Sequence, residues 1–284
     1  MSRSGAIVDQ ISIPEPVPGQ LNEQPRDLIV DSAGRVQLFL GQVPAWLYTF
    51  DLDISSVPQK SQFPGWNTVS NVRYGGIATY GNYLYLADQA FLNDTTDGII
   101  RVDLSDNSYT RFYGDSFTSF AHLAMGLNGR LYALPSSGHG IEVHIYDPRS
   151  MILLEKVQLT RTLQGPLEIA SGLAVDVHGN MFAAAGQTIF RFDSSGQEVS
   201  RLNVNIGLGD RFGDLNIHPD GSLVAGSDGS DVVLTNTAFS ALSVFNVPGL
   251  NFVAWVVPPV PEPSSLVLFV LGGVLVSVRR YRYP

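Results

Sequence analysis

The chain has 284 residues, of which 44% are hydrophobic and 15% charged, so it is long and apolar enough to bury the core of one large domain. It contains no cysteine, which excludes disulfides and thiolate metal sites. Three arginines and Glu262 lie in the last 24 residues; the remaining 14 basic and 25 acidic residues give a body charge of −11, against −9 for the whole chain. That balance argues against nucleic-acid binding, which needs basic clusters.

The first 25 residues form an N-terminal lead. A signal peptide has an apolar core of about 7–15 residues. Asp9 and Gln10 interrupt the only short apolar stretch near Met1, so no signal peptide is visible in this sequence.

A turn built on glycine recurs five times along the body, at Gly34, Gly81, Gly129, Gly179 and Gly221. Successive turn glycines are 47, 48, 50 and 42 residues apart, and each is followed by two apolar segments of strand length. The first of these predicted strands are Val36–Leu40, Tyr83–Leu86, Leu131–Leu134, Met181–Ala185 and Leu223–Ala225. The next ones are Leu47–Leu52, Ile99–Leu104, Ile141–Tyr146, Ile189–Phe192 and Val232–Leu234.

The unit from Gly172 to Val199 shows the repeat most clearly, as four strands separated by glycine turns. Its first strand alternates Leu173, Val175 and Val177 with Ala174, Asp176 and His178, which is the two-residue period of a β-strand. A four-stranded unit cannot bury both faces alone, so the repeat predicts an all-β fold, a β-propeller of five or six four-stranded blades. A β-sandwich is disfavoured because sandwiches lack a repeat of this length.

The end of the repeat region leaves the number of blades open. Residues 251–257 alternate well enough to form a closing strand, with which residues 5–13 could pair. The propeller has five blades if each blade is continuous, and six if one blade is split between the termini.

The unit from Gly172 to Val199 resembles the repeats of NHL and SMP-30/gluconolactonase-like propellers. Those repeats follow an apolar strand with an Asp-x-x-Gly-Asn turn, here Asp176 to Asn180, then an aromatic strand and an Ile-x-x-Phe strand, here Ile189 to Phe192. The resemblance implies a propeller, and for lactonase-like members a divalent cation held by Glu, Asn and Asp side chains of different blades. The other units depart further, so no catalytic residue carries over.

Three acidic residues near the starts of blades are candidates for such a site: Asp27, Asp176 and Asp214. Asp176 stands three residues before its turn glycine and Asp214 seven before its own, so we expect these two at different depths in their blades. Turn capping or solvent exposure is the expected role of these acids.

Other candidates for chemistry are weak. The histidines are His122, His139, His144, His178 and His218, and no pair has metal-ligand spacing. No Gly-x-Ser-x-Gly elbow supports a hydrolase nucleophile, so we expect no catalytic residue and no histidine metal site.

Two acidic turns, 93–98 and 227–231, are rich in oxygen atoms. Loops of this kind can hold Ca²⁺, but neither has a complete ligand series and Asx turns explain them at least as well. Trp46, Trp66 and Trp255 could stack on carbohydrate, although packing between blades is the expected use.

The C-terminal segment has three parts in a fixed order. Residues 258–263 form a Pro-rich spacer that contains the box Pro261, Glu262 and Pro263. An uncharged apolar run follows: Leu266, Val267, Leu268, Phe269, Val270, Leu271, Gly272, Gly273, Val274, Leu275, Val276, Ser277 and Val278. With its flanks this run predicts one transmembrane helix, and Arg279, Arg280 and Arg282 form a basic stop after it.

This order of a Pro-Glu-Pro box, one apolar span and a cluster of arginines resembles the PEP-CTERM sorting signal of Gram-negative bacteria. The resemblance implies recognition by an exosortase, an integral-membrane enzyme that cuts near the box and delivers the protein to the cell surface, often beside exopolysaccharide. A plain tail anchor and a buried C-terminal helix are the alternatives.

The predicted domains are the lead 1–25, a propeller with its closing strand 26–257, the spacer 258–263, and the helix with its basic tail 264–284. We expect an exported protein that is held transiently in the inner membrane and then lies at the cell surface or outside the cell. Export without a visible signal peptide is explained if the true start lies upstream.

The propeller is expected to be a binding module, with extracellular polysaccharide or protein as its partner, rather than an enzyme. A cation-dependent, lactonase-like hydrolase on the same fold is the alternative. No cofactor is expected unless Ca²⁺ occupies the acidic turns.

Overall fold

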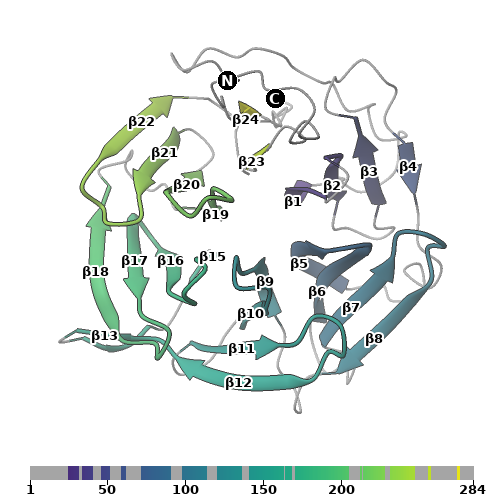
Figure 1. Ribbon diagram of the computed structural model, residues 1–284, viewed down its shortest axis with the longest axis horizontal. Coiled ribbons are helices and arrows are strands. Elements are labelled where there is room, and N and C mark those ends of the chain that lie inside the picture. Colours follow the sequence, from purple (N-terminus) through teal and green to yellow (C-terminus); the bar gives the residue numbers. More distant parts are fainter. Residues whose placement is uncertain are drawn as a thin grey trace, which may run out of the picture.

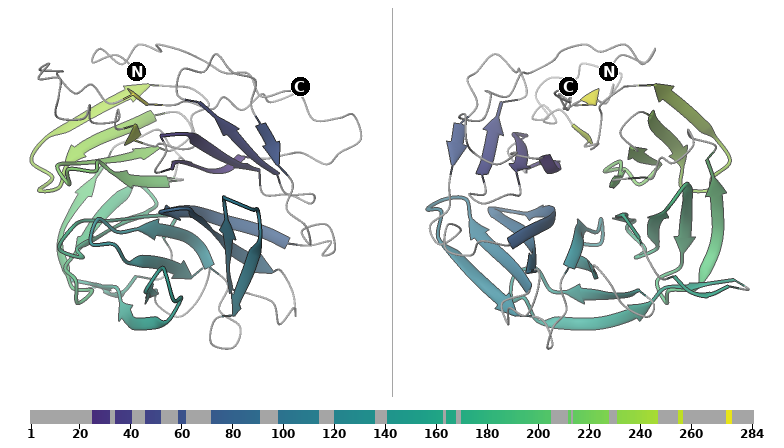
Figure 2. Two further views of the ribbon diagram at one scale, coloured as in Figure 1. Left: turned by 45° about the vertical axis from the view of Figure 1, so that its right-hand side comes forward. Right: turned by 180° about the vertical axis from the view of Figure 1, so that it is seen from behind.

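A computed structural model describes residues 25–31, 34–40, 46–51, 59–61, 72–90, 98–113, 120–135, 141–162, 164–167, 170–204, 212, 214–227, 231–246, 255–256 and 274–275. These residues form a ring of five blades around a central axis, and each blade is a four-stranded antiparallel sheet made of consecutive strands (Figure 1). The inner strand of each blade lies nearest the axis, and the ring of blades is also seen in a view turned by 45° and in one from behind (Figure 2).

The blades follow one another along the chain. Blade 1 contains β1 (Pro25–Val30), β2 (Val36–Leu40), β3 (Trp46–Phe50) and β4 (Gln59–Ser61). Blade 2 contains β5 (Val72–Tyr80), β6 (Tyr83–Ala90), β7 (Gly98–Asp103) and β8 (Tyr109–Tyr113). Blade 3 contains β9 (Phe120–Met125), β10 (Leu131–Pro135), β11 (Glu142–Tyr146) and β12 (Leu153–Gln158).

Blade 4 contains β15 (Gly172–Val175), β16 (Met181–Ala185), β17 (Thr188–Phe192) and β18 (Glu198–Asn203). Blade 5 contains β19 (Asp214–Ile217), β20 (Leu223–Ser227), β21 (Asp231–Asn236) and β22 (Leu242–Asn246). A short hairpin, β13 (Thr160–Arg161) and β14 (Gly165–Pro166), separates blades 3 and 4.

The prediction of a propeller is confirmed, and the number of blades is five. The repeat predicts the second and third strands of each blade. Their ends agree with the observed ends to within two residues, except that β6 continues to Ala90. Each of the five described blades is complete within its own segment, so none of these five is split between the termini.

The turn glycines explain why this pattern could be read from the sequence. Gly34, Gly81, Gly129, Gly179 and Gly221 all adopt positive φ angles, between 57° and 82°. Glycine reaches this left-handed region without the steric penalty that a Cβ brings. Side-chain bonds support the same turns: Asp176 Oδ1, for example, accepts hydrogen bonds from the backbone N–H groups of His178 and Asn180.

One detail of the predicted strand in blade 4 is wrong. The alternation in the sequence runs on to His178, whereas β15 ends at Val175 and the side chain of Val177 is 56% exposed. The hydrogen bonds of Asp176 to the backbone beyond it favour a turn here over continued pairing with β16.

The apolar core lies between the blades. Within the described part of the chain, buried apolar side chains form four clusters, which join blades 1 and 2, 2 and 3, 3 and 4, and 4 and 5. Tyr85 packs with Phe120 in the second of these clusters, and Phe182 with Phe212 in the fourth. Full burial of one such side chain contributes roughly 1.5–3 kcal/mol, so neighbouring blades stabilise each other mainly by the hydrophobic effect.

The inner strands approach each other closely around the axis. A Cβ atom at Gly172 would lie 2.7 Å from the backbone nitrogen of Leu215 and 2.9 Å from the carbonyl carbon of Asp214. A Cβ atom at Gly76 would lie 2.9 Å from Asp27 Oδ2 and 3.0 Å from the backbone nitrogen of Leu123. Glycine at position 172 therefore allows blade 4 to approach blade 5 this closely, and glycine at position 76 allows blade 2 to approach blades 1 and 3.

The side of the ring between blades 5 and 1 differs from the others. Among the described residues no apolar cluster joins these two blades, and the two-stranded sheet of β23 (Trp255–Val256) and β24 (Val274–Leu275) lies between them (Figure 1). The expected closing strand is thus described only at 255–256, where it pairs antiparallel with β24 and lies beside β1. The pairing expected for residues 5–13 falls outside the described residues.

The predicted transmembrane helix is not confirmed. Of the apolar run Leu266–Val278, only Val274 and Leu275 are described, and they are extended in β24. The described part of the chain contains no helix of sufficient length and hydropathy to cross a membrane. The Pro-Glu-Pro box and the basic stop lie outside the described residues.

Replacing Gly172 with alanine tests the close approach of the inner strands. Because the new Cβ would collide with backbone atoms of β19, we expect Gly172→Ala to lower the free energy of unfolding by about 2–3 kcal/mol, measured by urea denaturation. Gly186→Ala in the same blade is the matched control. Gly186 has a φ of 59°, and a Cβ atom there would meet no other atom within 4 Å, so this change should cost only about 1 kcal/mol. Equal losses in the two variants would contradict the proposed crowding.

Candidate ligand-binding site in the axial cavity

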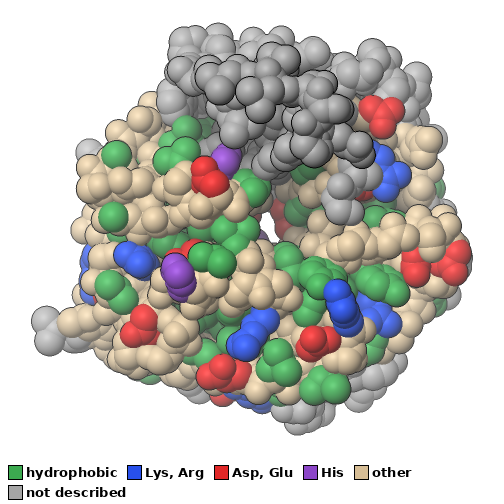
Figure 3. Space-filling model, in the orientation of Figure 1, with side chains coloured by type: hydrophobic (Ala, Val, Ile, Leu, Met, Phe, Trp, Pro, Cys, Tyr) green, Lys and Arg blue, Asp and Glu red, His purple; other side chains and the backbone are tan. Residues whose placement is uncertain are grey.

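The inner strands of the five blades enclose a cavity of about 200 Å³ on the axis of the ring. The space-filling view shows the molecule hollowed at this position (Figure 3). Asp27 and Asp214 lie where their strands begin, and we call this the acid end of the cavity. Val30, Leu127 and Pro219 lie where inner strands end or just beyond, and we call this the apolar end.

The acid end is formed by the same position in each blade. Counting back seven residues from the turn glycines of blades 1, 3, 4 and 5 gives Asp27, His122, Gly172 and Asp214. Blade 2 has a shorter turn, and Gly76 takes the corresponding place, in contact range of both Asp27 and His122. Gly76 leaves room for the carboxylate of Asp27, and Gly172 leaves room for the backbone of Asp214 and Leu215.

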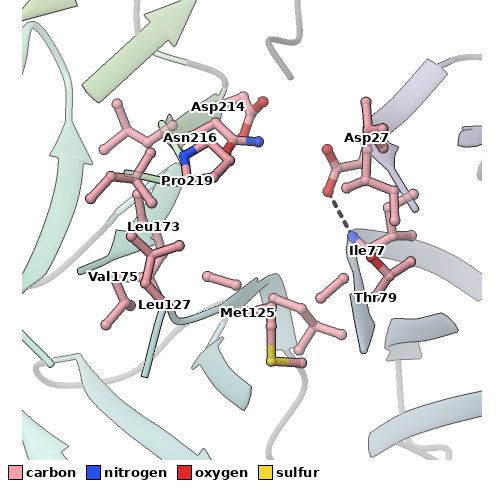
Figure 4. A pocket seen from close by; sticks show the side chains of 18 residues that line it. Asp27, Ile77, Thr79, Met125, Leu127, Leu173, Val175, Asp214, Asn216 and Pro219 are labelled. Carbon is pink, nitrogen blue, oxygen red and sulfur yellow. Dashed lines mark hydrogen bonds between the residues drawn. The ribbon is translucent and has the colours of Figure 1, made fainter. Parts of the chain in front are cut away.

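Asp27 links blade 1 to blade 2. Its Oδ2 accepts a hydrogen bond from the backbone N–H of Ile77 at 2.6 Å, and its Oδ1 accepts one from the N–H of Leu28 at 2.7 Å. Only 7% of the residue is exposed. The carboxyl group is therefore fixed at the wall of the cavity, as Figure 4 shows for the bond to Ile77.

The pKa of Asp27 is raised from 3.8 to about 7. Burial is the main cause, because it disfavours the charged form, and the two backbone N–H bonds only partly oppose it. Asp27 is therefore close to half-protonated at neutral pH, which makes it sensitive to any charge that approaches it.

Asp214 faces Asp27 across the cavity. It is 7% exposed, and Figure 4 shows the two carboxylates on opposite walls, with Asn216 beside Asp214. Asp214 pairs directly with Ser227 of β20, so the two side chains stand on the same face of blade 5. The Oγ of Ser227 is fully buried and has no hydrogen-bond partner within the described part of the chain.

His122 completes the polar positions at the acid end. Burial of its ring lowers its pKa from 6.5 to about 4, so the imidazole is neutral at physiological pH. His122 does not line the cavity itself, although its neighbour Leu123 does.

The described residues do not match the cation site that a lactonase resemblance implies. They include no group of three or more His, Asp or Glu side chains that could hold a metal ion. We therefore derive no metal-dependent step for this cavity.

The three acids predicted from the sequence separate into two kinds. Asp176 caps the turn after β15, as expected, and its Oδ2 also accepts a bond from Asn180 Nδ2 at 2.7 Å. Asp27 and Asp214 are each only 7% exposed, so the expectation of solvent exposure is wrong for these two. They differ from Asp176 because they lie at the starts of their strands and point into the cavity.

The other sequence candidates lie away from the cavity. His144 is buried and its ring packs edge-on against Phe120, while His178 and His218 lie in turns. Trp46 is covered by Lys60, whose Nζ lies 3.9 Å from the ring centroid, so its face is not an open stacking surface. His139, Trp66 and residues 93–97 and 228–230 lie outside the described residues, and the side chain of Trp255 is not described.

A signal in the sequence could have identified the acid end. Asp27-Leu28 and Asp214-Leu215 are the same dipeptide, each seven residues before a turn glycine. Asp176 does not share this position, because it belongs to the turn and not to the start of a strand.

Asp27 is expected to titrate near pH 7 in the native protein, with Asp214 across the cavity and His122 on the other side of Gly76 as neighbouring titratable groups. Because the native state holds the proton more tightly than the unfolded chain, the stability linked to Asp27 is full below about pH 4 and is lost as the pH rises to about 7. The ¹³C chemical shift of its carboxyl carbon, assigned with Asp27→Asn, measures this pKa. Asp220 is the control, since hydrogen bonds from Ser222 lower its pKa to about 2. An Asp27 that is still fully charged at pH 5 would contradict the burial argument.

Comparison with known proteins gives separate results for the tail and the body. The PEP-CTERM protein-sorting motif matches residues 259–282. No curated protein matches the sequence. The streptogramin B lyase structure is 10% identical with a TM-score of 0.54, over 87% of this chain and 89% of the lyase. A catalytically inactive virginiamycin B lyase from Staphylococcus aureus with quinupristin is 11% identical with a TM-score of 0.55, over 84% of this chain and 78% of the lyase.

Identities this low establish the fold and not the activity. The resemblance to NHL and SMP-30-like repeats stays a prediction. The chain is thus a five-bladed β-propeller, similar in fold to the virginiamycin B lyase-like propellers, that carries a PEP-CTERM sorting motif at residues 259–282.

Proposed function

We propose that this is an exported protein whose C-terminal motif is processed by an exosortase and whose propeller acts as a binding module at the cell surface. The observation that carries the proposal is the sorting motif at residues 259–282. In this proposal the apolar run Leu266–Val278 holds the protein transiently in the inner membrane, and Arg279, Arg280 and Arg282 keep the C-terminus on the cytoplasmic side.

The architecture of the ring supports a binding role. The inner strands begin at the acid end of the cavity. The segments that connect the outer strand of one blade to the inner strand of the next therefore reach the ring at this end. Segments that connect elements of a rigid scaffold commonly carry the binding residues. Extracellular polysaccharide and protein are the two partner classes that suit a surface-displayed module.

Processing of the motif is tested by the intact mass of the protein isolated from its native cells. We expect the wild-type chain to end near Pro263, and Glu262→Ala to keep its complete tail and remain in the membrane fraction. The chain offers a matched control, because Pro14-Glu15-Pro16 repeats the box far from any apolar run. Glu15→Ala should therefore be processed like the wild type.

Two results would contradict the sorting proposal. One is an unprocessed chain that still ends at Pro284 in wild-type cells. The other is correct surface display of a variant that lacks residues 261–284. Either result would leave the tail as a plain membrane anchor or as a segment without a role in export.

An enzymatic role is the second candidate, and the fold shared with two lyases favours it. A propeller of this kind would act as a lyase or a lactonase-like hydrolase in the axial cavity. A panel of lactones and a streptogramin B substrate, incubated with the purified protein with and without divalent cations, separates the two functions. Turnover that is lost in both Asp27→Asn and Asp214→Asn would establish catalysis, and an inert protein would favour the binding module.

A further inference from the structure

The charged groups at the described part of the cavity wall all have one sign. Eighteen described residues line the cavity, and Asp27 and Asp214 are the ionisable ones among them. They belong to β1 and β19 and lie on opposite walls (Figure 4). In their charged forms, two carboxylates around a small space create a negative potential that attracts cations.

Apolar side chains make up much of the remaining wall, which also carries the polar side chains of Thr79 and Asn216. Leu127, Leu173 and Val175 line one side of the cavity and Met125 its floor in the view of Figure 4. The inner strand of blade 5 spans about 10 Å from Asp214 to Ile217, at roughly 3.4 Å per residue. The volume of about 200 Å³ is close to that of six or seven water molecules in the liquid, so the space suits a ligand of only a few carbon atoms.

These features distinguish an organic cation from a metal ion. Ca²⁺ takes six to eight oxygen ligands and Mg²⁺ nearly ideal octahedral geometry, whereas the described residues contain no metal-holding group. A metal ion would also gain nothing from the apolar walls. An ammonium group on a short hydrocarbon body uses both the carboxylates and the apolar surface.

We propose that the axial cavity binds a small primary amine in its protonated form, with the ammonium group between Asp27 and Asp214 and the hydrocarbon body toward the apolar end. The inference deepens the proposed binding role by giving the chemical class of the ligand. It does not depend on sorting, because the cavity lies in the propeller and the sorting motif at residues 259–282.

Isothermal titration calorimetry of the full-length protein in a maltoside detergent tests the proposal with three probes of equal chain length. We expect hexylammonium to bind at least tenfold more tightly than hexan-1-ol, which fills the same space without charge. Hexanoate should not bind, because its carboxylate would face Asp27 and Asp214.

Two variants then locate the site. Asp214→Asn and Asp27→Asn should each weaken hexylammonium binding at least tenfold and leave hexan-1-ol binding unchanged. Asp106→Asn is the control, because Asp106 is exposed in the turn between β7 and β8 and should not affect either probe. The near-UV circular dichroism of each variant shows whether it is folded. Asp214→Asn provides the test if Asp27→Asn is not folded, since Asp27 also holds the hydrogen bond from Ile77 that joins blades 1 and 2.

Three outcomes would overturn the proposal. Equal affinities for hexylammonium and hexan-1-ol would show an apolar cavity without cation selectivity. Displacement of hexylammonium by millimolar Ca²⁺ or Mg²⁺ would indicate a metal site. Unchanged hexylammonium binding in a folded Asp214→Asn variant would place the amine elsewhere. Each of these results can occur with normal processing of the tail, so failure of this inference is distinguishable from failure of the sorting proposal.

Discussion

The structure depends on how closely five strands can approach one axis. Each blade must bury its faces against its neighbours, which forces the inner strands together at the centre of the ring. Gly76 and Gly172 make this approach feasible, because a Cβ atom at either position would collide with the neighbouring blade. The cavity is the space that the inner strands leave at the axis. Asp27 and Asp214, which lie next to these two glycines, determine the charge of its wall.

Several acidic side chains near the turns bind the backbone of their own turn, whereas Asp27 binds the backbone of another blade. Asp31, Asp176, Asp193 and Asp220 bind backbone N–H groups of their own turns and so favour the conformations that separate the strands. Asp27 instead binds the backbone of the next blade, at a burial that raises its pKa to about 7. A carboxyl group kept in such surroundings opposes stability at neutral pH, which is typical of groups retained for binding or chemistry.

The fold could be predicted from the sequence because its signals are local. A left-handed glycine and the apolar strand after it are neighbours in the chain, and they identify all five blades. The candidate site could not be predicted in the same way, because it depends on which residues meet across blades. Nothing near Asp27 in the sequence indicates that its carboxylate reaches Ile77, fifty residues away, and the cover of Lys60 over Trp46 is equally invisible.

The two parts of the chain meet at the side of the ring between blades 5 and 1. There β23, which lies beside β1, pairs with β24, and β24 belongs to the segment matched by the sorting motif. A cut near the Pro-Glu-Pro box would separate β24 from the propeller and leave β23 without this partner. Asp27 and Asp214 belong to the two blades that flank this side. Processing of the tail would therefore remove β24 from the side of the ring that these two blades flank, while the described residues that line the cavity belong to neither β23 nor β24.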